Sequence, residues 1–236
     1  MLIYVISVEF LVRLMRSERF CVVVICVTLF SEYTTVGLVR SHIFRTGRPH
    51  QRLILCLLSW RCSPTYCFFL VFEEVSRKHI LKLFVLRFLN GVKVESLEQS
   101  ANEYLQYLLS KKKQDLVWAR LKECKGETFV LASASVEPFV SVLGSKLSMQ
   151  YVATQMECKE GTYSGRLLHD ATARKLGFLS SQIQGFSPSL IATVITDNLS
   201  DRDLLCIADK PVVVLNRSKD RLRWKGLEAE YLEVWR

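Results

Sequence analysis

The sequence has no uninterrupted apolar stretch as long as the roughly 20 residues that a membrane-spanning helix needs. Two short hydrophobic runs, residues 53–58 and 67–72, are separated by Arg61 and Pro64. Residues 1–15 are also apolar, but charged side chains interrupt them and the basic start of a signal peptide is absent. We therefore expect no bilayer crossing, and we treat residues 1–19 as an N-terminal extension.

The eight cysteines lack the spacing of metal and redox motifs. They contain no Cys-x-x-Cys pair and show no zinc-ligand spacing with the four histidines. We interpret them as reduced thiols and expect a cytoplasmic protein. The sequence has no RNA- or DNA-binding motif and no interleaving of basic and aromatic residues, so we expect no nucleic-acid partner. Internal repeats, low-complexity segments and long linkers are absent as well.

Positive charge is concentrated in the first half of the chain. Residues 1–120 carry 17 basic and 9 acidic side chains, whereas residues 121–236 carry 15 and 14. Three interpretations of this excess stay open: solvated helix faces, a field that attracts an anionic substrate, or a surface that meets anionic lipid without spanning the membrane. The sequence identifies no protein partner.

Alternating strand and helix patterns predict an α/β fold with a doubly wound, mostly parallel sheet. At 236 residues the chain is long enough for one such domain with an inserted cap. Residues 95–109 have the spacing of an amphipathic helix, and a second helix is predicted over residues 115–124. Residues 151–166 have the pattern of a β-hairpin, with Glu160 and Gly161 at its turn.

An apolar, β-branched run over residues 191–196 predicts a buried strand that ends at two carboxylates, Asp197 and Asp201. Open α/β sheets place their chemistry beyond the carboxyl ends of such strands, where Mg²⁺ takes one or two carboxylates. Aspartate is also a common helix N-cap, and a helix is predicted to follow. The pattern alone therefore leaves metal binding and capping open.

A second predicted strand, residues 127–135, ends in Ser133 and Ser135 before another helical segment. A hydroxyl and free backbone N–H groups at a strand end that opens a helix can hold a phosphate oxygen, although a serine there can equally be a cap. Lys175 lies between the two strands on a helical segment and could bring a positive charge to the same edge. A lone lysine on a helix is more often solvated.

The order and spacing of these segments resemble the haloacid dehalogenase superfamily, in particular its phosphoserine-phosphatase-like branch. The resemblance covers about residues 20–235 and rests on residues 131–139 (LASASVEPF), Lys175 with Leu179, residues 196–205 (TDNLSDRDLL) and residues 210–216 (KPVVVLN). It implies a Rossmannoid core formed by residues 20–30 and 116–236, with a helical cap, residues 31–115, inserted after the first core strand.

The same resemblance implies roles for individual residues. Ser133 would bind the transferring phosphoryl group, and Lys175 would neutralise its charge. Asp197 and Asp201 would hold Mg²⁺. The residues implied to contact the substrate are Thr28, Ser133, Ala134, Lys175 and Asn198.

The first family motif is degenerate in this chain. The family begins its first strand with an aspartate nucleophile, a variable residue, a second aspartate, glycine, threonine and leucine. When residues 28–29 are matched to the threonine-leucine pair, Val24 stands at the nucleophile position and Cys26 at the acid/base position, so both carboxylates are lost. A cysteine in an apolar strand is more often an inert hydrophobe than a nucleophile. A rival register places Ser7 and Glu9 at the two positions, but no Gly-Thr follows.

Two functions stay open on these grounds. The family implies a hydrolase, a Mg²⁺-dependent phosphomonoesterase that acts on a small phosphorylated metabolite. The alternative is a catalytically silent relative that binds a phosphorylated ligand or a protein partner. Valine can neither attack phosphorus nor ligate a metal, so the missing nucleophile favours the alternative on mechanism.

Overall fold

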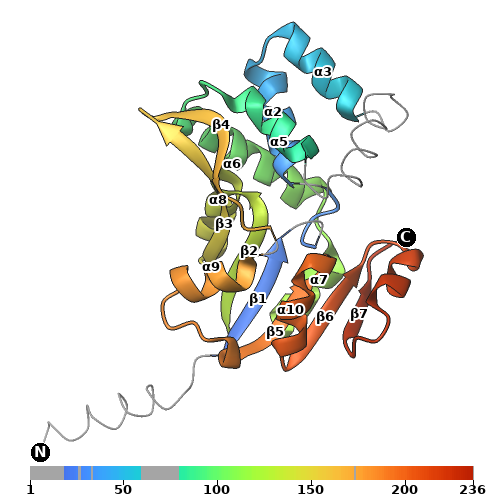
Figure 1. Cartoon of the computed structure of the whole chain (residues 1–236). Coiled ribbons are helices and arrows are strands. Elements are labelled where there is room, and N and C mark those ends of the chain that lie inside the picture. The colour runs from blue at the N-terminus through green and yellow to red at the C-terminus, as the bar shows by residue number, and fades with distance from the viewer. Residues whose placement is uncertain (1–18, 26–27, 33, 60–79, 173, 236) are drawn as a thin grey trace, which may run out of the picture.

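The computed structural model describes residues 19–25, 28–32, 34–59, 80–172 and 174–235, and a seven-stranded sheet lies at their centre (Figure 1). The strands are β1 (Phe20–Ile25), β2 (Thr128–Val136), β3 (Gln150–Lys159), β4 (Thr162–His169), β5 (Ile191–Thr196), β6 (Lys210–Leu215) and β7 (Glu230–Glu233). They are ordered β4-β3-β2-β1-β5-β6-β7, and every neighbouring pair is parallel except β3 and β4. The predicted α/β fold with a mostly parallel sheet is confirmed.

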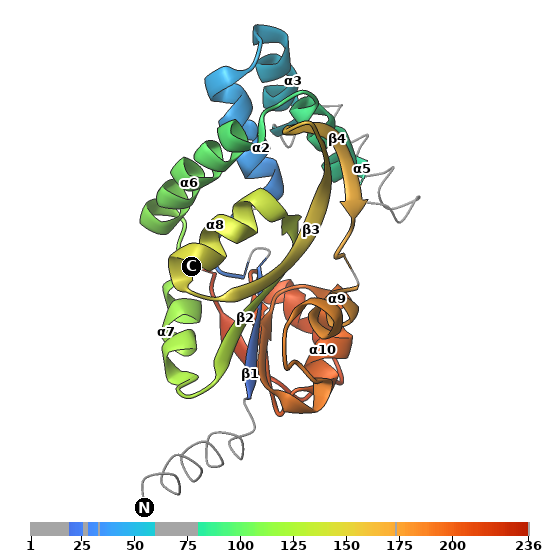
Figure 2. The ribbon, with the colours of Figure 1, turned by 90° about the vertical axis from the view of Figure 1, so that its left-hand side faces the viewer.

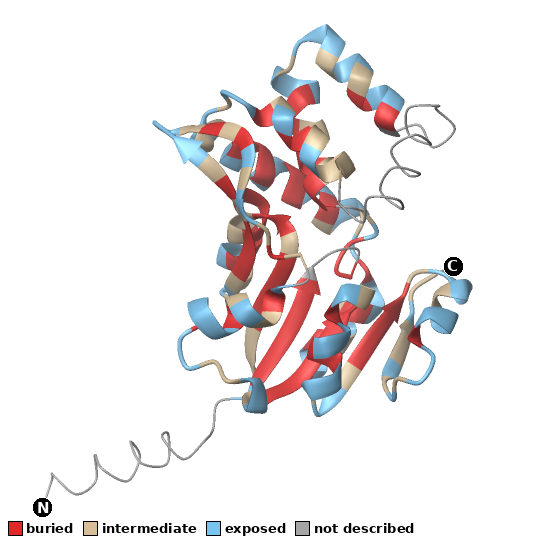
Figure 3. Ribbon diagram, in the orientation of Figure 1, coloured by how far each residue is buried: buried red, intermediate tan, exposed pale blue. Residues whose placement is uncertain are grey.

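The central strand β1 is buried on both faces because alternate side chains of a strand point to opposite sides. Cys21 and Val23 belong to one apolar layer, whereas Phe20, Val22 and Val24 belong to the other. A run of apolar residues without polar alternation suits a strand covered by helices on both sides. Figure 3 shows the result as an unbroken line of buried residues along β1.

Helices cover the two faces of the sheet, as a doubly wound fold requires (Figure 2). α7 (Asp115–Glu123) and α8 (Glu137–Leu147) pack on the face that includes Cys21 and Val23. α9 (Lys175–Gln182) and α10 (Arg202–Ile207) pack on the opposite face. α6 (Val94–Lys111) forms an outer layer against α8.

A group of helices lies beyond the carboxyl edge of the sheet (Figure 1). These helices are α2 (Thr34–Thr46), α3 (Pro49–Ser59), α5 (Ile80–Leu86), the 3₁₀ helix η1 (Arg87–Leu89) and α6. The described residues within the predicted cap, 31–115, are therefore mainly helical. Among the described residues, no helix combines the length and the apolar composition needed to cross a bilayer.

Several segments named in the sequence analysis lie wholly or partly outside the described residues. They are most of the N-terminal extension, with Ser7 and Glu9, the apolar run 67–72, and Cys26. The other apolar run, 53–58, lies on α3, where Leu55 and Leu58 are buried and Leu53 is exposed. Only one side of this run is therefore buried, because Cys56 and Leu57 are exposed as well.

The β3–β4 hairpin extends from the core to the helices above the edge. Its turn has positive φ angles at Glu160 (47°) and Gly161 (73°), the pair that a two-residue type I′ turn needs, as predicted. The backbone N–H of Tyr163 donates to the carbonyl of Val92 at 2.9 Å, and that of Gly91 donates to the Tyr163 carbonyl at 2.8 Å. The layer over the sheet edge therefore includes this hairpin as well as the segment 31–115.

The last part of the chain contains shorter helices than the sequence pattern predicts. The segment after β5 begins as a 3₁₀ helix, η3 (Leu199–Asp201), before α10, and another short 3₁₀ helix, η2 (Pro188–Leu190), precedes β5. A third 3₁₀ helix, η4 (Ser218–Trp224), is anchored by the buried Trp224. The edge strand β7 pairs in parallel with β6.

The close packing of β4 on η1 depends on Gly165, whose φ is 73° and whose added Cβ would lie 3.0 Å from both the Arg87 Cα and the Leu86 carbonyl oxygen. Gly161 has the same φ and no atom within 4 Å of an added Cβ. We expect Gly161→Ala to lower the free energy of unfolding by about 1–2 kcal/mol, the cost of the left-handed conformation. Gly165→Ala should lower it by a further ~1–3 kcal/mol, because two backbones must separate. Urea denaturation measures both, and equal losses would contradict this packing.

Candidate functional site

The predicted polar residues gather at the carboxyl edge of three neighbouring strands. β1 lies between β2 and β5, with Ile25 opposite Ser133 of β2. Asp197 follows directly after β5, and the Thr28 hydroxyl, in the loop after β1, donates a hydrogen bond to Asp197 Oδ1 at 2.6 Å. Parallel strands that are adjacent end at the same edge, so the fold brings together groups more than one hundred residues apart.

Asp197 is a partly buried carboxylate that is oriented by neutral donors. Its Oδ2 accepts a hydrogen bond from Asn216 Nδ2 at 3.1 Å, in addition to the Thr28 bond on Oδ1. Burial raises the pKa of Asp197, and the nearby Asp201 charge raises it further, although the Thr28 bond acts in the opposite direction. In the described part of the chain, no lysine or arginine forms an ion pair with Asp197.

Lys175 and Asp201 form an ion pair in which each side chain is only 2% exposed. Asp201 Oδ2 also accepts a hydrogen bond from the Thr196 hydroxyl at 2.8 Å. The expected solvated position of a lone lysine is therefore wrong for Lys175, which begins α9 and points into the protein. Because Asp201 is neutralised by Lys175, it acts here as a partner that orients the lysine.

Ser133 lies where β2 departs from regular pairing. The register between β2 and β3 shifts between Ala132 and Val136, so the backbone of the intervening residues leaves the ladder. The Ser133 hydroxyl accepts a hydrogen bond from the Ser135 N–H at 2.9 Å, and the Ser135 hydroxyl bonds to that of Thr34 on α2. An irregular strand end with hydroxyls and backbone groups is suited to an anion.

The capping alternative applies to Asn198. Its Oδ1 accepts a hydrogen bond from the Ser200 N–H at 3.1 Å, which caps η3. Neither Asp197 nor Asp201 caps a helix with its side chain. The predicted substrate-contacting residue Asn198 thus has a structural role in this fold, and the two carboxylates are left for other partners.

Sequence reasoning missed a polar cluster centred on Lys82 of α5. Lys82 Nζ donates to the carbonyl oxygen of Ala134 at 2.8 Å and to Asp170 Oδ1 at 3.1 Å. Although burial raises the pKa of Asp170, hydrogen bonds from Thr172 and the charge of Lys82 lower it to about 2. The only sequence signal was a single lysine in the apolar helix ILKLFVL. This lysine ties α5 to the same strand end as Ser133, since Ala134 is the next residue.

The nucleophile position of the first motif is apolar in the structure. Val24 is fully buried and packs in the layer that also contains Ala132 and Leu179. Cys26, the acid/base position, lies outside the described residues. Along the described part of β1, no side chain can serve as a carboxylate nucleophile, because the strand reads FCVVVI.

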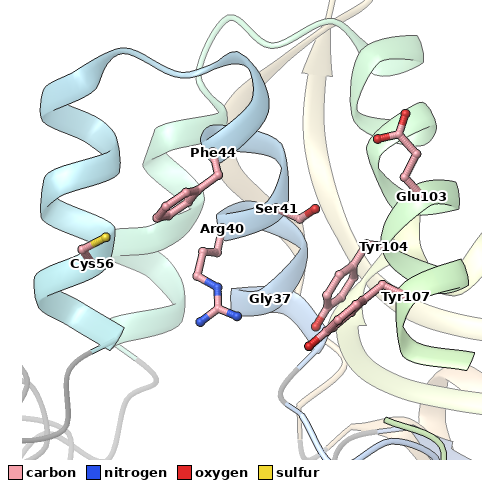
Figure 4. Close-up of a pocket in the computed structure, with 8 residues that line it drawn as sticks. All are labelled: Gly37, Arg40, Ser41, Phe44, Cys56, Glu103, Tyr104 and Tyr107. Carbon is pink, nitrogen blue, oxygen red and sulfur yellow. The ribbon is translucent and has the colours of Figure 1, made fainter. Parts of the chain in front are cut away.

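A hollow of about 600 Å³ lies between α2, α3 and α6 (Figure 4). In the close-up, Arg40 and Phe44 of α2 face the space from one helix and Tyr104 and Tyr107 of α6 from another. The two tyrosine rings are stacked, with centroids 6.1 Å apart. The hollow therefore combines aromatic surface with a guanidinium group.

The segment after β1 connects this hollow to the sheet edge. Thr28 bonds to Asp197, as described above, and Thr34 bonds to the Ser135 hydroxyl. Between them, Glu32 accepts hydrogen bonds from the Tyr104 hydroxyl at 3.2 Å and from Arg40 at 3.3 Å. The residues that would contact the organic part of a ligand are thus attached to those that would contact its phosphate.

Comparisons with known proteins support the fold. The solved structures that this chain is similar to include phosphoserine phosphatases, and they support the mostly parallel α/β fold predicted from the motifs. The chain is similar to a protein of unknown function from Bordetella pertussis Tohama I, with a TM-score of 0.70 and 16% identity over 92% of this chain and 99% of that one. It is also similar to a phosphoserine phosphatase in a phospho-aspartyl intermediate analogue state, with a TM-score of 0.51 and 12% identity over 91% and 92% of the two chains.

A third similar structure is cytosolic 5'-nucleotidase IIIB bound to cytidine, with a TM-score of 0.59 and 12% identity over 92% of this chain and 79% of that one. No family model matches the sequence. A search of curated proteins found no relative. The low identities mean that these likenesses concern the fold.

The residues at the edge fit a single Mg²⁺ ion held mainly by Asp197. Its carboxylate has a raised pKa and lacks a basic partner among the described residues, so a cation would relieve an unfavourable burial of charge. Mg²⁺ requires only one or two carboxylates when phosphate and water complete its coordination. Asp201 is already neutralised by Lys175, which leaves one carboxylate and predicts weak binding in the absence of phosphate.

Replacement of Asp197 should show how much its buried charge lowers the stability of the folded chain. Folding raises the pKa of Asp197, so the folded chain favours the protonated carboxyl group. The contribution of this group to stability is therefore largest at low pH. It is lost as the pH rises above 3.8, the ordinary pKa of an aspartate. We expect Asp197→Asn to melt at a higher temperature than the native chain at pH 7 in EDTA, with the difference shrinking on acidification. Mg²⁺ should stabilise only the native chain. A pH-independent difference in thermal melts would contradict this account.

The buried ion pair gives a separate prediction. Lys175→Met leaves the Asp201 charge buried without its partner and should lower the free energy of unfolding by about 3–5 kcal/mol. Lys175→Met combined with Asp201→Leu should recover most of that loss. The exposed pair Arg221–Glu233 is the control, since Arg221→Met should cost at most ~1 kcal/mol. Chemical denaturation of the four proteins would refute the assignment if the double variant were less stable than Lys175→Met.

Proposed function

We propose that the carboxyl edge of this sheet binds a small phosphorylated molecule together with Mg²⁺, and that the chain does not hydrolyse it through a covalent aspartyl intermediate. The observation that carries the proposal is Val24: a fully buried valine lies one residue before the end of the central strand, at the position where the resemblance implies a carboxylate nucleophile. An acyl-phosphate intermediate forms by attack of a carboxylate oxygen on phosphorus. Valine has no lone pair to donate.

The remaining groups at the edge support phosphate binding. Ser133 supplies a hydroxyl at an irregular strand end, and Lys175 brings a positive charge that Asp201 holds in place. Mg²⁺, when bound, would add charge neutralisation between Asp197 and the phosphate oxygens. The excess of basic residues in the first half of the chain would attract an anionic ligand toward this edge.

The residues that line the hollow between α2, α3 and α6 indicate which kind of chemical group the non-phosphate part of the ligand would be. Two stacked tyrosine rings and Arg40 favour a planar or cyclic group over an aliphatic chain. The link through Glu32 would place this recognition next to the phosphate site.

Hydrolysis is the second candidate. The retention of Ser133, Lys175 and Asp197 around the lost nucleophile favours it, because these groups stabilise the charge of a transferring phosphoryl group. Cys26 would then have to supply the nucleophile, with its thiolate attacking phosphorus and the alkoxide leaving with a proton.

The two candidates differ in phosphate release from an aryl phosphate with and without Mg²⁺. We expect the native chain to bind inorganic phosphate, seen as Mg²⁺-dependent thermal stabilisation, and to release almost no phosphate. Val24→Asp should create turnover, and Val24→Asp with Cys26→Asp should exceed it by about 10²–10⁴-fold, the usual value of general acid–base help. Ser133→Ala should abolish phosphate stabilisation. Ser180→Ala, which removes a hydroxyl that bonds within α9, should not.

Three outcomes would overturn the proposal. Vigorous turnover by the native chain that is lost in Cys26→Ala would assign the chemistry to a thiol. Turnover that is lost in Ser7→Ala or Glu9→Ala instead would support the rival first strand. Absence of phosphate stabilisation in the native chain would remove the binding function itself.

A further inference from the structure

A second cluster of reactive side chains lies near the amino end of β1, on the face covered by α7 (Figure 2). Cys21 is the second residue of β1, Cys124 follows the last residue of α7, and Glu127 immediately precedes β2. The two sulfur atoms and a carboxylate oxygen all lie within 4.8 Å of one another. Cys21 is 0% exposed and Cys124 is 4% exposed.

Local structure holds the three side chains in this arrangement. The Cys124 N–H donates to the Leu121 carbonyl and ends α7. Gly126, with a φ of 83°, then turns the chain back toward the sheet. The Thr193 hydroxyl of β5 donates to Glu127 Oε1 at 3.2 Å and so fixes the carboxylate beside the two sulfur atoms.

The other oxygen of this carboxylate has no hydrogen-bond partner among the described residues. Glu127 Oε2 is buried, and no donor reaches it. A buried carboxylate oxygen that lacks a partner costs free energy, and such groups are rare in folded proteins. A cation that the three side chains share would remove this cost.

The protein groups nearby do not supply that cation. Arg120 Nη1 donates to the Cys124 sulfur at 3.8 Å, but its Nε bonds to Glu230 at 2.9 Å and it makes no ion pair with Glu127. The two thiols share a hydrogen bond, which raises the pKa of Cys21 and lowers the pKa of Cys124 to about 7.

We propose that Cys21, Cys124 and Glu127 bind a thiophilic divalent cation, and that Zn²⁺ is the ion that fits best. Two sulfur atoms and one carboxylate oxygen are ligands that Zn²⁺ accepts, whereas Mg²⁺ and Ca²⁺ prefer oxygen alone. Three protein ligands leave the fourth tetrahedral position for water. When both thiols are deprotonated, the ligands carry three negative charges; the ion offsets two, and Arg120 Nη1 donates a hydrogen bond to the Cys124 sulfur.

This site is separate from the candidate phosphate site. Cys21 and Val24 are three residues apart along β1, a separation of about 10 Å in an extended strand. The ion would join β1, the end of α7 and the turn before β2, and would therefore stabilise the core. The sequence shows no zinc motif because Cys21 lies 103 positions before Cys124 in the chain.

The experiment uses the full-length chain, reduced, stripped of metal and titrated with Zn²⁺. We expect one ion per chain, a higher melting temperature, and a thiolate-to-metal absorption band when Co²⁺ replaces Zn²⁺. Cys124→Ala should abolish the band and weaken Zn²⁺ binding by about 100-fold or more. Glu127→Gln, which nearly preserves shape, should weaken binding while the two thiolates keep the band.

Matched controls separate this site from others. Cys206→Ala removes an exposed thiol on α10, and Asp197→Asn alters the strand-end carboxylate; neither should change Zn²⁺ affinity. The proposal fails if Zn²⁺ binding is unaffected by Glu127→Gln and Cys124→Ala, or is lost when the exposed Cys56, Cys158 and Cys206 are all replaced. It also fails if a Cys21–Cys124 disulfide is recovered and the reduced chain does not bind Zn²⁺. If Cys124→Ala does not fold, Glu127→Gln and the cobalt spectrum of the native chain decide.

Discussion

The burial of β1 on both faces, between β2 and β5, is the constraint on which the rest of the structure depends. Parallel neighbours end at one edge, so Ser133, Thr28 and Asp197 meet there even though they are far apart in the chain. The same burial makes the end of β1 apolar. A carboxylate at Val24 would be surrounded by aliphatic side chains and would need a cation to remain charged. Without that carboxylate, a cation at this edge would have fewer ligands and would bind more weakly.

Buried charged side chains in this molecule have two kinds of environment, one with a partner of opposite charge and one without. Lys175 and Asp201 neutralise one another in a nearly water-free setting, which holds α9 and the start of α10 together beside the sheet. Asp197 and Glu127, at opposite ends of the central strands, have no basic partner of their own in the described part of the chain. Each of these two carboxylates would be stabilised by a cation, and the neighbouring ligand atoms differ: oxygen at one end and sulfur at the other.

The helices above the edge share an apolar cluster with β2 and α8, and short polar contacts also attach them to the site. Thr34 bonds to Ser135, Glu32 bonds to Tyr104, and Lys82 bonds to the carbonyl oxygen of Ala134. A ligand that occupies the hollow and the strand ends together would therefore perturb the same hydrogen bonds.

The sequence by itself determined the features that depend on local periodicity and turn chemistry: the buried strands, the helix at residues 94–111, and the hairpin turn at Glu160 and Gly161. It also predicted strands that carry Ser133 and Asp197 at their carboxyl ends, and the structure places these residues at the carboxyl ends of the two strands that flank β1. The tertiary structure alone decided which charges meet. Three contacts each join elements separated by many residues: Lys175 with Asp201, Lys82 with Ala134, and Cys21 with Cys124 and Glu127. No spacing along the chain encodes the distance between side chains on different elements.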